Sequence, residues 1–352
     1  MPSELTLGES LAARGVSRRA FLKFCASIAS AMALPPSVAP AMAEAMAKAK
    51  RPSVIYLSFQ ECTGCLESLT RAHQASLETL IFDLVSLEYQ HTIMAPSGEA
   101  AERSLHQAIE ENRGKYVLIV DGAIPLGDPG YGTVAGQSFA DIMTETAKGA
   151  AAILAVGTCA SFGGLPKADP NPTGAVPVSH IVKDKPIVNI PGCPPIAVVM
   201  TSVVAHFLTF GKLPDLDHLN RPKAFFGDTI HDRCYRRPFY DQGKFAKTFD
   251  DAGARQGWCL YELGCKGPVT YNACATVKWN GGVSFPIESG HGCIGCSEPD
   301  FWDRGSFYQP LPMSLWTNRG KTLAAAAAAG AAIGAGAAIA SRMRQRKLVE
   351  EK

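Results

Sequence analysis

The stretch Val54-Ile55-Tyr56-Leu57-Ser58-Phe59-Gln60-Glu61-Cys62-Thr63-Gly64-Cys65 joins an apolar, β-rich run directly to a C-x-x-C pair. Runs that are apolar on both faces and alternate with helix-compatible segments are typical of a parallel sheet covered on each side. The sequence therefore predicts a three-layer α/β domain over residues 51–220. Its expected strands lie at 54–59, 116–120, 152–156 and 187–190, and its expected helices include 66–80 and 103–110.

The overall composition is that of an ordinary globular protein. Of the 352 residues, 47% are hydrophobic and 8% aromatic, which gives no indication of disorder. The formal net charge of +2 disappears once the first 43 residues are set aside. A nearly neutral body offers no electrostatic basis for nucleic-acid binding. The charge of the N-terminal segment comes from Arg14, Arg18, Arg19 and Lys23 against Glu4 and Glu9.

The N-terminal segment carries a paired arginine followed by a short, weakly apolar run. The motif Ser17-Arg18-Arg19-Ala20-Phe21-Leu22-Lys23 and the Ala-x-Ala sites around 41–43 are typical of a twin-arginine export signal. We therefore predict that residues 1–43 are a signal peptide. The alternative is an amphipathic N-terminal helix of the folded domain. Because this pathway carries proteins that are already folded, export does not require disulfides.

The C-terminal end has a candidate membrane anchor. Residues 322–341 form a run of 20 mainly Ala, Gly and Ile residues without charge, followed by a basic cluster at 342–347. A helix of this length spans the roughly 30 Å hydrocarbon core of a bilayer. The basic cluster would keep the C-terminus cytoplasmic under the positive-inside rule. We predict a transmembrane anchor, and a flexible Ala/Gly tail is the alternative.

A first group of cysteines follows the predicted strands. Cys62 and Cys65 follow the first strand, and Cys159 and Cys193 each follow a later one. Loops at the carboxyl edge of a parallel sheet converge on one crevice, so these cysteines can meet in space. Four thiolates at one point suit a cubane iron-sulfur cluster. Zinc is one rival, and a thioredoxin-like dithiol is another, although it leaves Cys159 and Cys193 unexplained.

Residues 221–310 are rich in Gly, Pro, aromatic residues and Cys, with few periodic runs. Metal centres would hold such a segment, because their binding energy becomes folding energy. Cys25 lies inside the expected signal peptide, and the other cysteines plus His231 divide into three groups with none left over. That division argues against a disulfide scaffold. The second group is His231, Cys234, Cys259 and Cys265, and the third is Cys274, Cys293 and Cys296.

From residue 51 to 302 the chain resembles the small subunit of membrane-bound, periplasmic nickel-iron hydrogenases. The motifs that carry the resemblance are Glu61-Cys62-Thr63-Gly64-Cys65, Pro191-Gly192-Cys193-Pro194-Pro195 and Trp258-Cys259-Leu260-Tyr261-Glu262-Leu263-Gly264-Cys265-Lys266-Gly267-Pro268. The resemblance implies a flavodoxin-like domain followed by a smaller, irregular iron-sulfur domain.

The resemblance also implies two 4Fe-4S clusters and one 3Fe-4S cluster. The first group would hold a proximal 4Fe-4S cluster, the second a distal 4Fe-4S cluster and the third a medial 3Fe-4S cluster. Pro286 stands where a proline replaces a fourth cysteine in this family, which leaves one corner of the cubane open. Gly64 and Gly164 occupy the positions of extra cysteines in oxygen-tolerant relatives, so we expect a conventional proximal cluster and ordinary oxygen sensitivity.

The expected function is electron transfer within a hydrogenase heterodimer. The resemblance implies that the nickel-iron site lies on a large subunit and that Glu61 belongs near a proton path. Electrons would leave through His231 toward a cytochrome b or another quinone-linked membrane protein, at the periplasmic face of the membrane. The alternatives are a free-standing multi-cluster electron carrier and a metal-free, disulfide-bonded periplasmic binding protein.

Overall fold

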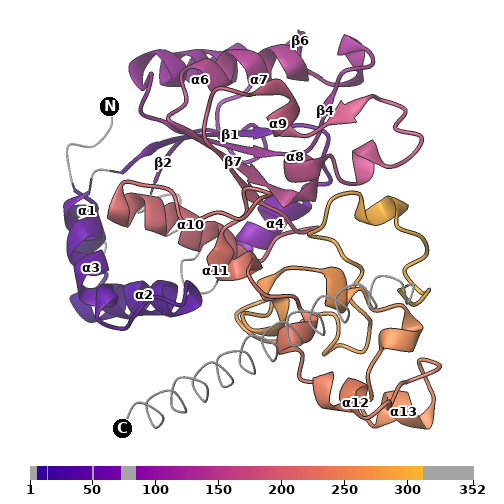
Figure 1. Cartoon of the computed structure of the whole chain (residues 1–352). Helices are drawn as coiled ribbons and strands as arrows, with labels where there is room; N and C mark the ends of the chain where they lie inside the picture. Colours follow the sequence, from indigo (N-terminus) through magenta and orange to yellow (C-terminus); the bar gives the residue numbers. More distant parts are fainter. Residues whose placement is uncertain (1–5, 14, 50, 73–84, 312–352) are drawn as a thin grey trace, which may run out of the picture. The chain divides into compact units, whose positions relative to one another are not determined.

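The computed structural model describes residues 6–13, 15–49, 51–72 and 85–311 (Figure 1). These belong to a compact unit, Met1–Gln309, apart from residues 310 and 311. The predicted anchor at 322–341 lies outside the described residues. Among the described helices, none combines the length and the apolar character that crossing a bilayer requires.

A five-stranded parallel sheet forms the centre of the α/β domain, as the sequence predicts. The strand order β2-β1-β3-β7-β9 is the flavodoxin-like order, with a topological switch between β1 and β3. Four of the strands coincide with the predicted runs, whereas β2 was not predicted. The strands are β1 (Ser53–Ser58), β2 (Ser86–Tyr89), β3 (Val117–Asp121), β7 (Ala152–Val156) and β9 (Ile187–Ile190).

Helices cover both faces of this sheet. Side chains such as Leu118 and Ile153 pack on one face against α6 (Glu99–Glu111), α7 (Phe139–Lys148) and α9 (Val178–Ile181). On the other face, Val54 and Val188 share a core with α4 (Gly64–Thr70) and α10 (Ala197–Phe210). The helix expected at 66–80 ends at Thr70 in its described part, and α8 (Gly157–Phe162) follows β7 directly.

The N-terminal segment forms three helices that pack against each other and against α10: α1 (Leu7–Ala13), α2 (Arg18–Ala31) and α3 (Val38–Lys48). Cys25, Met42 and Met46 are fully buried in this packing. Ser17 caps α2 by accepting a hydrogen bond from the Ala20 N–H at 3.2 Å, while both arginines of the paired motif are exposed. The segment therefore buries several of its apolar side chains and exposes Arg18, Arg19 and Lys23.

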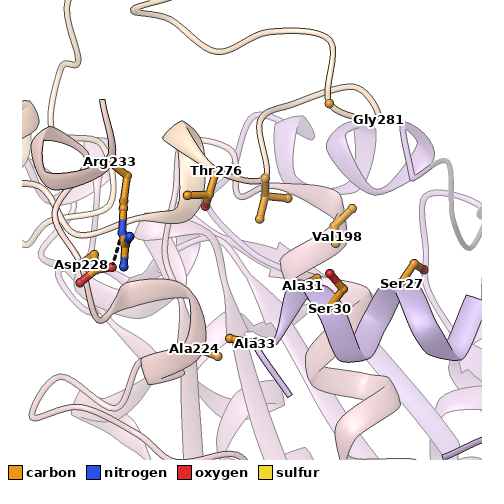
Figure 2. A pocket seen from close by; sticks show the side chains of 12 residues that line it. Ser27, Ser30, Ala31, Ala33, Val198, Ala224, Asp228, Arg233, Thr276 and Gly281 are labelled. Carbon is orange, nitrogen blue, oxygen red and sulfur yellow. Dashed lines mark hydrogen bonds and ion pairs between the residues drawn. The ribbon is translucent and has the colours of Figure 1, made fainter. Parts of the chain in front are cut away.

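A cavity of about 510 Å³ lies between α2 and the later part of the chain (Figure 2). Ser27 and Ser30 of α2 form one side, and the ion pair of Arg233 with Asp228, at 2.7 Å, lies on the other. Among the described residues, no cysteine lines this cavity. It is therefore separate from the thiol groups described below.

The remaining elements are short. Two antiparallel pairs extend the α/β domain: β4 (Ile124–Pro125) with β8 (Ala175–Val176), and β5 (Thr133–Val134) with β6 (Gln137–Ser138). Short turns η2 (Pro129–Tyr131) and η3 (Leu165–Lys167) lie in the same loops. From residue 221 to 311 the chain forms only single turns, as its composition predicts. These are α11 (Lys223–Phe226), η4 (His231–Arg233), α12 (Arg237–Asp241), α13 (Ala252–Arg255), η5 (Tyr261–Leu263), η6 (Gly267–Val269), η7 (Ala273–Ala275) and η8 (Phe301–Asp303).

A buried arginine ties this irregular segment to the sheet domain. Arg221 is 1% exposed, and its guanidinium contacts Asp217 at 2.8 Å and Glu298 at 3.0 Å. The rings of Phe226 and Tyr271 each lie 5.5 Å from the guanidinium carbon. Arg221 thus joins the end of the sheet domain to the segment that carries the third cysteine group.

Candidate iron-sulfur sites

The first cysteine group lies at the carboxyl edge of the sheet, where the topology predicts it. Cys62 and Cys65 stand in the loop after β1 and in the first turn of α4, while Cys159 lies in α8 and Cys193 follows β9. Thr63 between the first two adopts a left-handed backbone conformation, with φ of 64°. This turn brings the C-x-x-C pair back toward the sheet edge.

The thiols of this group influence one another electrostatically. Burial raises the pKa of Cys65 well above its usual value, and the Asp121 carboxylate and the thiols of Cys159, Cys193 and Cys62 raise it further. Burial, followed by the neighbouring Cys193, raises the pKa of Cys159 to about 12. The four thiols therefore lie near one another at the sheet edge. Iron ligation needs thiolates, so binding would release their protons.

Two glycines leave room beside these thiols. A Cβ at Gly157, where φ is +84°, would collide with the Cys65 Sγ. A Cβ at Gly164, where φ is +52°, would lie 2.7 Å from the Cys159 Sγ. Side chains larger than hydrogen would therefore displace the thiols at both places.

Asp121 is a site residue that the sequence patterns did not identify. It ends β3, is fully buried, and accepts a hydrogen bond from the Tyr56 hydroxyl at 3.1 Å. Burial raises the pKa of Asp121 to about 7. The hydrogen bond with Ser58 lowers this pKa, and the nearby Glu61 raises it. Asp121 directly follows the predicted strand 116–120. Its place at the carboxyl edge of the sheet, near the first cysteine group, could therefore have been predicted from the sequence.

Glu61 lies next to the first ligand candidate. The Thr63 hydroxyl donates a hydrogen bond to its Oε1 at 3.4 Å, and its Oε2 is buried without a hydrogen-bond partner among the described residues. Burial raises the pKa of Glu61, whereas the Thr63 hydrogen bond lowers it. The side chain is therefore partly withdrawn from solvent at the edge of the first group.

The second group brings together three cysteines and a buried histidine. Burial raises the pKa of Cys259 to about 12; the Tyr261 N–H opposes this shift, and the thiols of Cys265 and Cys234 add to it. His231 is 7% exposed and its ring lies edge-on to Tyr240, with centroids 4.7 Å apart. The Cys259 thiol is among the groups that raise the pKa of Tyr240, after burial and Tyr261. His231 and Cys259 therefore flank the same tyrosine.

The third group surrounds a small cavity. Cys274, Cys293 and Cys296 all line it, and so does Pro286. Burial raises the pKa of Cys293 well above its usual value, with further contributions from the thiols of Cys265, Cys296 and Cys274. Burial and the Cys274 thiol raise the pKa of Cys296 to about 12. The proline therefore lines the same cavity as the three cysteines of this group.

In the described structure the thiols form neither disulfides nor a group close enough to hold a single metal ion. All eleven cysteines are free thiols, so the disulfide scaffold is not present. Over the described part of the chain, no three His, Cys, Asp or Glu side chains converge closely enough to hold one metal ion. Thiolates of a tetrahedral zinc site lie only about 3.8 Å apart, given a Zn–S distance of roughly 2.3 Å. A 4Fe-4S cluster uses four cysteine thiolates as ligands.

Two sequence families match this chain, one over the sheet domain and one over the irregular segment that follows it. The family "NADH ubiquinone oxidoreductase, 20 Kd subunit" matches residues 62–207, which span most of the sheet domain. The family of the C-terminal part of the NiFe/NiFeSe hydrogenase small subunit matches residues 226–309, which contain the second and third cysteine groups.

Individual relatives and solved structures agree with these families. The chain is 49% identical over 299 residues to the uptake hydrogenase small subunit of Azotobacter vinelandii, covering 85% of this chain and 84% of that one. It is 45% identical over 309 residues to the hydrogenase-1 small chain of Escherichia coli K12, covering 88% and 83%. The NiFeSe hydrogenase structure of Dm. baculatum aligns with a TM-score of 0.69 at 37% identity; the alignment covers 75% of this chain and 100% of that one. The NiFeSe hydrogenase structure of Desulfovibrio vulgaris Hildenborough aligns with a TM-score of 0.69 at 38% identity and covers 74% of this chain and 98% of that one. The chain therefore belongs to the family of nickel-iron hydrogenase small subunits.

Proposed function

We propose that this chain conducts electrons from hydrogen oxidation on a large subunit to a membrane acceptor. The proposal rests on one observation: hydrogen bonds join the third thiol group to both others. The Cys293 N–H donates to the Cys265 Sγ at 3.3 Å, and Thr158, next to Cys159, donates to the Cys296 carbonyl. The first group would hold a proximal 4Fe-4S cluster, the third a medial 3Fe-4S cluster and the second a distal 4Fe-4S cluster. When bound, such clusters accept and release one electron at a time.

The large subunit, which carries the nickel-iron site, would cover the first group. Cys62 is exposed, whereas Cys293 and Cys265 are each 7% exposed, so the first group is the one most open to the surface of this chain. Exposed apolar side chains lie on the loops β4–η2 and η3 of the same domain: Leu126, Tyr131 and Leu165 are 44%, 53% and 52% exposed. Such a surface suits a protein partner.

Glu61 is proposed to relay protons at this interface. Its Oε2 has no hydrogen-bond partner among the described residues, so it can accept a proton from a group on the partner. The test is hydrogen–deuterium exchange catalysed by the heterodimer. Glu61→Gln should slow exchange while leaving reduction of the clusters by hydrogen possible, and unchanged exchange would remove Glu61 from the path.

His231 is proposed as a ligand at the exit end. A neutral imidazole in place of a thiolate removes one negative charge and raises the cluster potential, as in Rieske centres. This would ease electron exit toward a cytochrome b or another quinone-linked membrane protein. We expect His231→Cys to slow delivery to that acceptor while hydrogen binding at the large subunit persists. Unchanged turnover with the membrane acceptor would count against the role.

The proximal cluster is proposed to be of the conventional four-cysteine type, with ordinary oxygen sensitivity. Gly164 supports this, because its backbone conformation and its closeness to Cys159 both disfavour a cysteine there. EPR of an oxidised sample that revealed a proximal species with more than four cysteine ligands would contradict it.

Export by the twin-arginine pathway, with anchoring at the periplasmic face of the membrane, completes the proposal. The support is the exposed arginine pair at the start of α2, together with the apolar run at 322–341.

Iron and acid-labile sulfide analysis of the purified protein tests the whole proposal. The assignment requires about eleven irons per chain, from two four-iron clusters and one three-iron cluster. A free-standing multi-cluster carrier would show the same iron content without a stable one-to-one complex with a large subunit. A chain without iron would fit neither function.

A further inference from the structure

Thr158 lies between the first and the third cysteine groups. Its side chain is 1% exposed, and it precedes Cys159 in α8. The Gly192 N–H donates a hydrogen bond to the Thr158 Oγ1 at 2.9 Å, and the same hydroxyl donates to the carbonyl of Cys296. The Thr158 N–H in turn donates to the Gly192 carbonyl at 3.0 Å.

These bonds join two loops that are distant in the sequence. Gly192 directly precedes Cys193 of the first group, whereas Cys296 belongs to the third. One buried hydroxyl therefore acts as acceptor toward one group and as donor toward the other.

We propose that Thr158 is a positioning residue that fixes the proximal cluster against the medial cluster and so sets the rate of electron transfer between them. This inference rests on the proposed function. In the step, the reduced proximal cluster loses one electron and the oxidised medial cluster gains it, and no bond forms or breaks. Hydrogen oxidation on the large subunit supplies the electron. Because electron transfer slows steeply with distance, a small displacement of one loop is enough to change the rate.

Two substitutions separate this role from simple packing. Thr158→Val keeps the shape but has neither donor nor acceptor, so both bonds of the hydroxyl are lost. Thr158→Ser keeps the hydroxyl and removes only a methyl group. If the bridge matters, the serine variant should behave like the parent and the valine variant should not.

The experiment uses the purified heterodimer of each variant. Iron content and the EPR spectrum of the three-iron cluster are measured first, and freeze-quenched samples then follow electron arrival at that cluster after mixing with hydrogen. For Thr158→Val we expect parental iron content, an altered magnetic interaction between the two clusters and roughly ten-fold slower electron arrival, the usual scale of a lost contact to a metal ligand. Thr158→Ser should match the parent in all three.

Several results would overturn the proposal. One is a valine variant with the parental spectrum and rate, and another is a serine variant as impaired as the valine variant. A valine variant that loses all iron together with its fold would show a general packing role, and one that loses only the three-iron cluster would show a role in assembling that cluster. Either result would also overturn the proposal. If the parent protein itself holds no iron, the proposed function fails instead, independently of Thr158.

Discussion

The backbone N–H of Cys293 donates a hydrogen bond to the Sγ of Cys265 at 3.3 Å. The bond joins the third cysteine group to the second, because Cys293 belongs to one and Cys265 to the other. The adjacent residue strengthens the junction, since the Lys266 N–H donates to the Cys293 carbonyl at 2.7 Å. Two backbone contacts therefore hold the third and second cysteine groups side by side.

Gly292 makes this junction possible, and its substitution provides the first prediction. A Cβ at Gly292 would lie 2.9 Å from the Cys265 Cα and 3.0 Å from its Cβ. Gly292→Ala should therefore push Cys293 away from Cys265 and weaken both sites. We expect loss of the three-iron EPR signal, or a shift in its potential, with the proximal signal retained.

Gly290→Ala is the matched control for that substitution. A Cβ at Gly290 meets no atom within 4 Å, although its φ of +93° adds some backbone strain. The control should keep all cluster signals. Equal effects of the two variants would show that backbone strain in this loop, rather than the junction, controls the clusters.

The sequence predicted the sheet and the position of the first four cysteines at its carboxyl edge, because both follow from local patterns. Continuous apolar runs identify buried parallel strands, and the cysteines directly follow them. Strand β2 was missed because it is a short edge strand whose described residues are mostly half-buried. Its polar and apolar residues do not form a continuous apolar run.

Contacts between distant loops could not be predicted from the sequence. Nothing in the pattern around Arg221 indicates that it lies buried between Asp217 and Glu298, and nothing around Thr158 indicates its bond to Cys296. Such pairings depend on how the irregular segment folds back on the sheet domain. That segment lacks the periodicity from which contacts can be inferred.

Arg221 supports a second prediction, on stability. Replacing it with methionine leaves Glu298 buried without its ionic partner, and breaking a buried pair in this way costs about 3–5 kcal/mol. Arg221→Met should lower the free energy of unfolding by this amount, measured from urea denaturation curves. The control Arg103→Met removes an exposed pair with Glu99, at 3.5 Å, and should change stability by less than about 1 kcal/mol.

The Arg221 site should also give stability a pH dependence. Burial alone would raise the pKa of Asp217, but the N–H and the guanidinium of Arg221 lower it below its usual value. This carboxyl therefore contributes its full stabilisation above the unfolded pKa of about 3.9, and loses it as the pH falls through the lower folded pKa. Asp217→Asn should flatten this part of the pH profile. A profile identical to that of the parent would show that other groups govern acid unfolding.

The N-terminal helices support a prediction about the precursor. Met42 of α3 is fully buried, so Met42→Ala in the full chain should reduce the stability of this segment by about 2–5 kcal/mol. Limited proteolysis should then cleave α1–α3 sooner. Glu44→Ala, at an exposed position of the same helix, should leave the cleavage rate unchanged. Equal cleavage of both variants and the parent would mean that these helices are not packed on α10.

The last prediction separates export from folding. Arg18 and Arg19 are exposed at the start of α2, so changing both to lysine keeps the charge and removes no buried contact. The double variant should fold normally with parental iron content. If the twin-arginine machinery recognises this arginine pair, however, the double variant should accumulate in the cytoplasm, which cell fractionation would detect. Lys48→Arg, at an exposed end of α3, should leave the parental distribution unchanged. A double variant that still reaches the periplasm would contradict the signal assignment, and α1–α3 would then be better regarded as part of the folded domain.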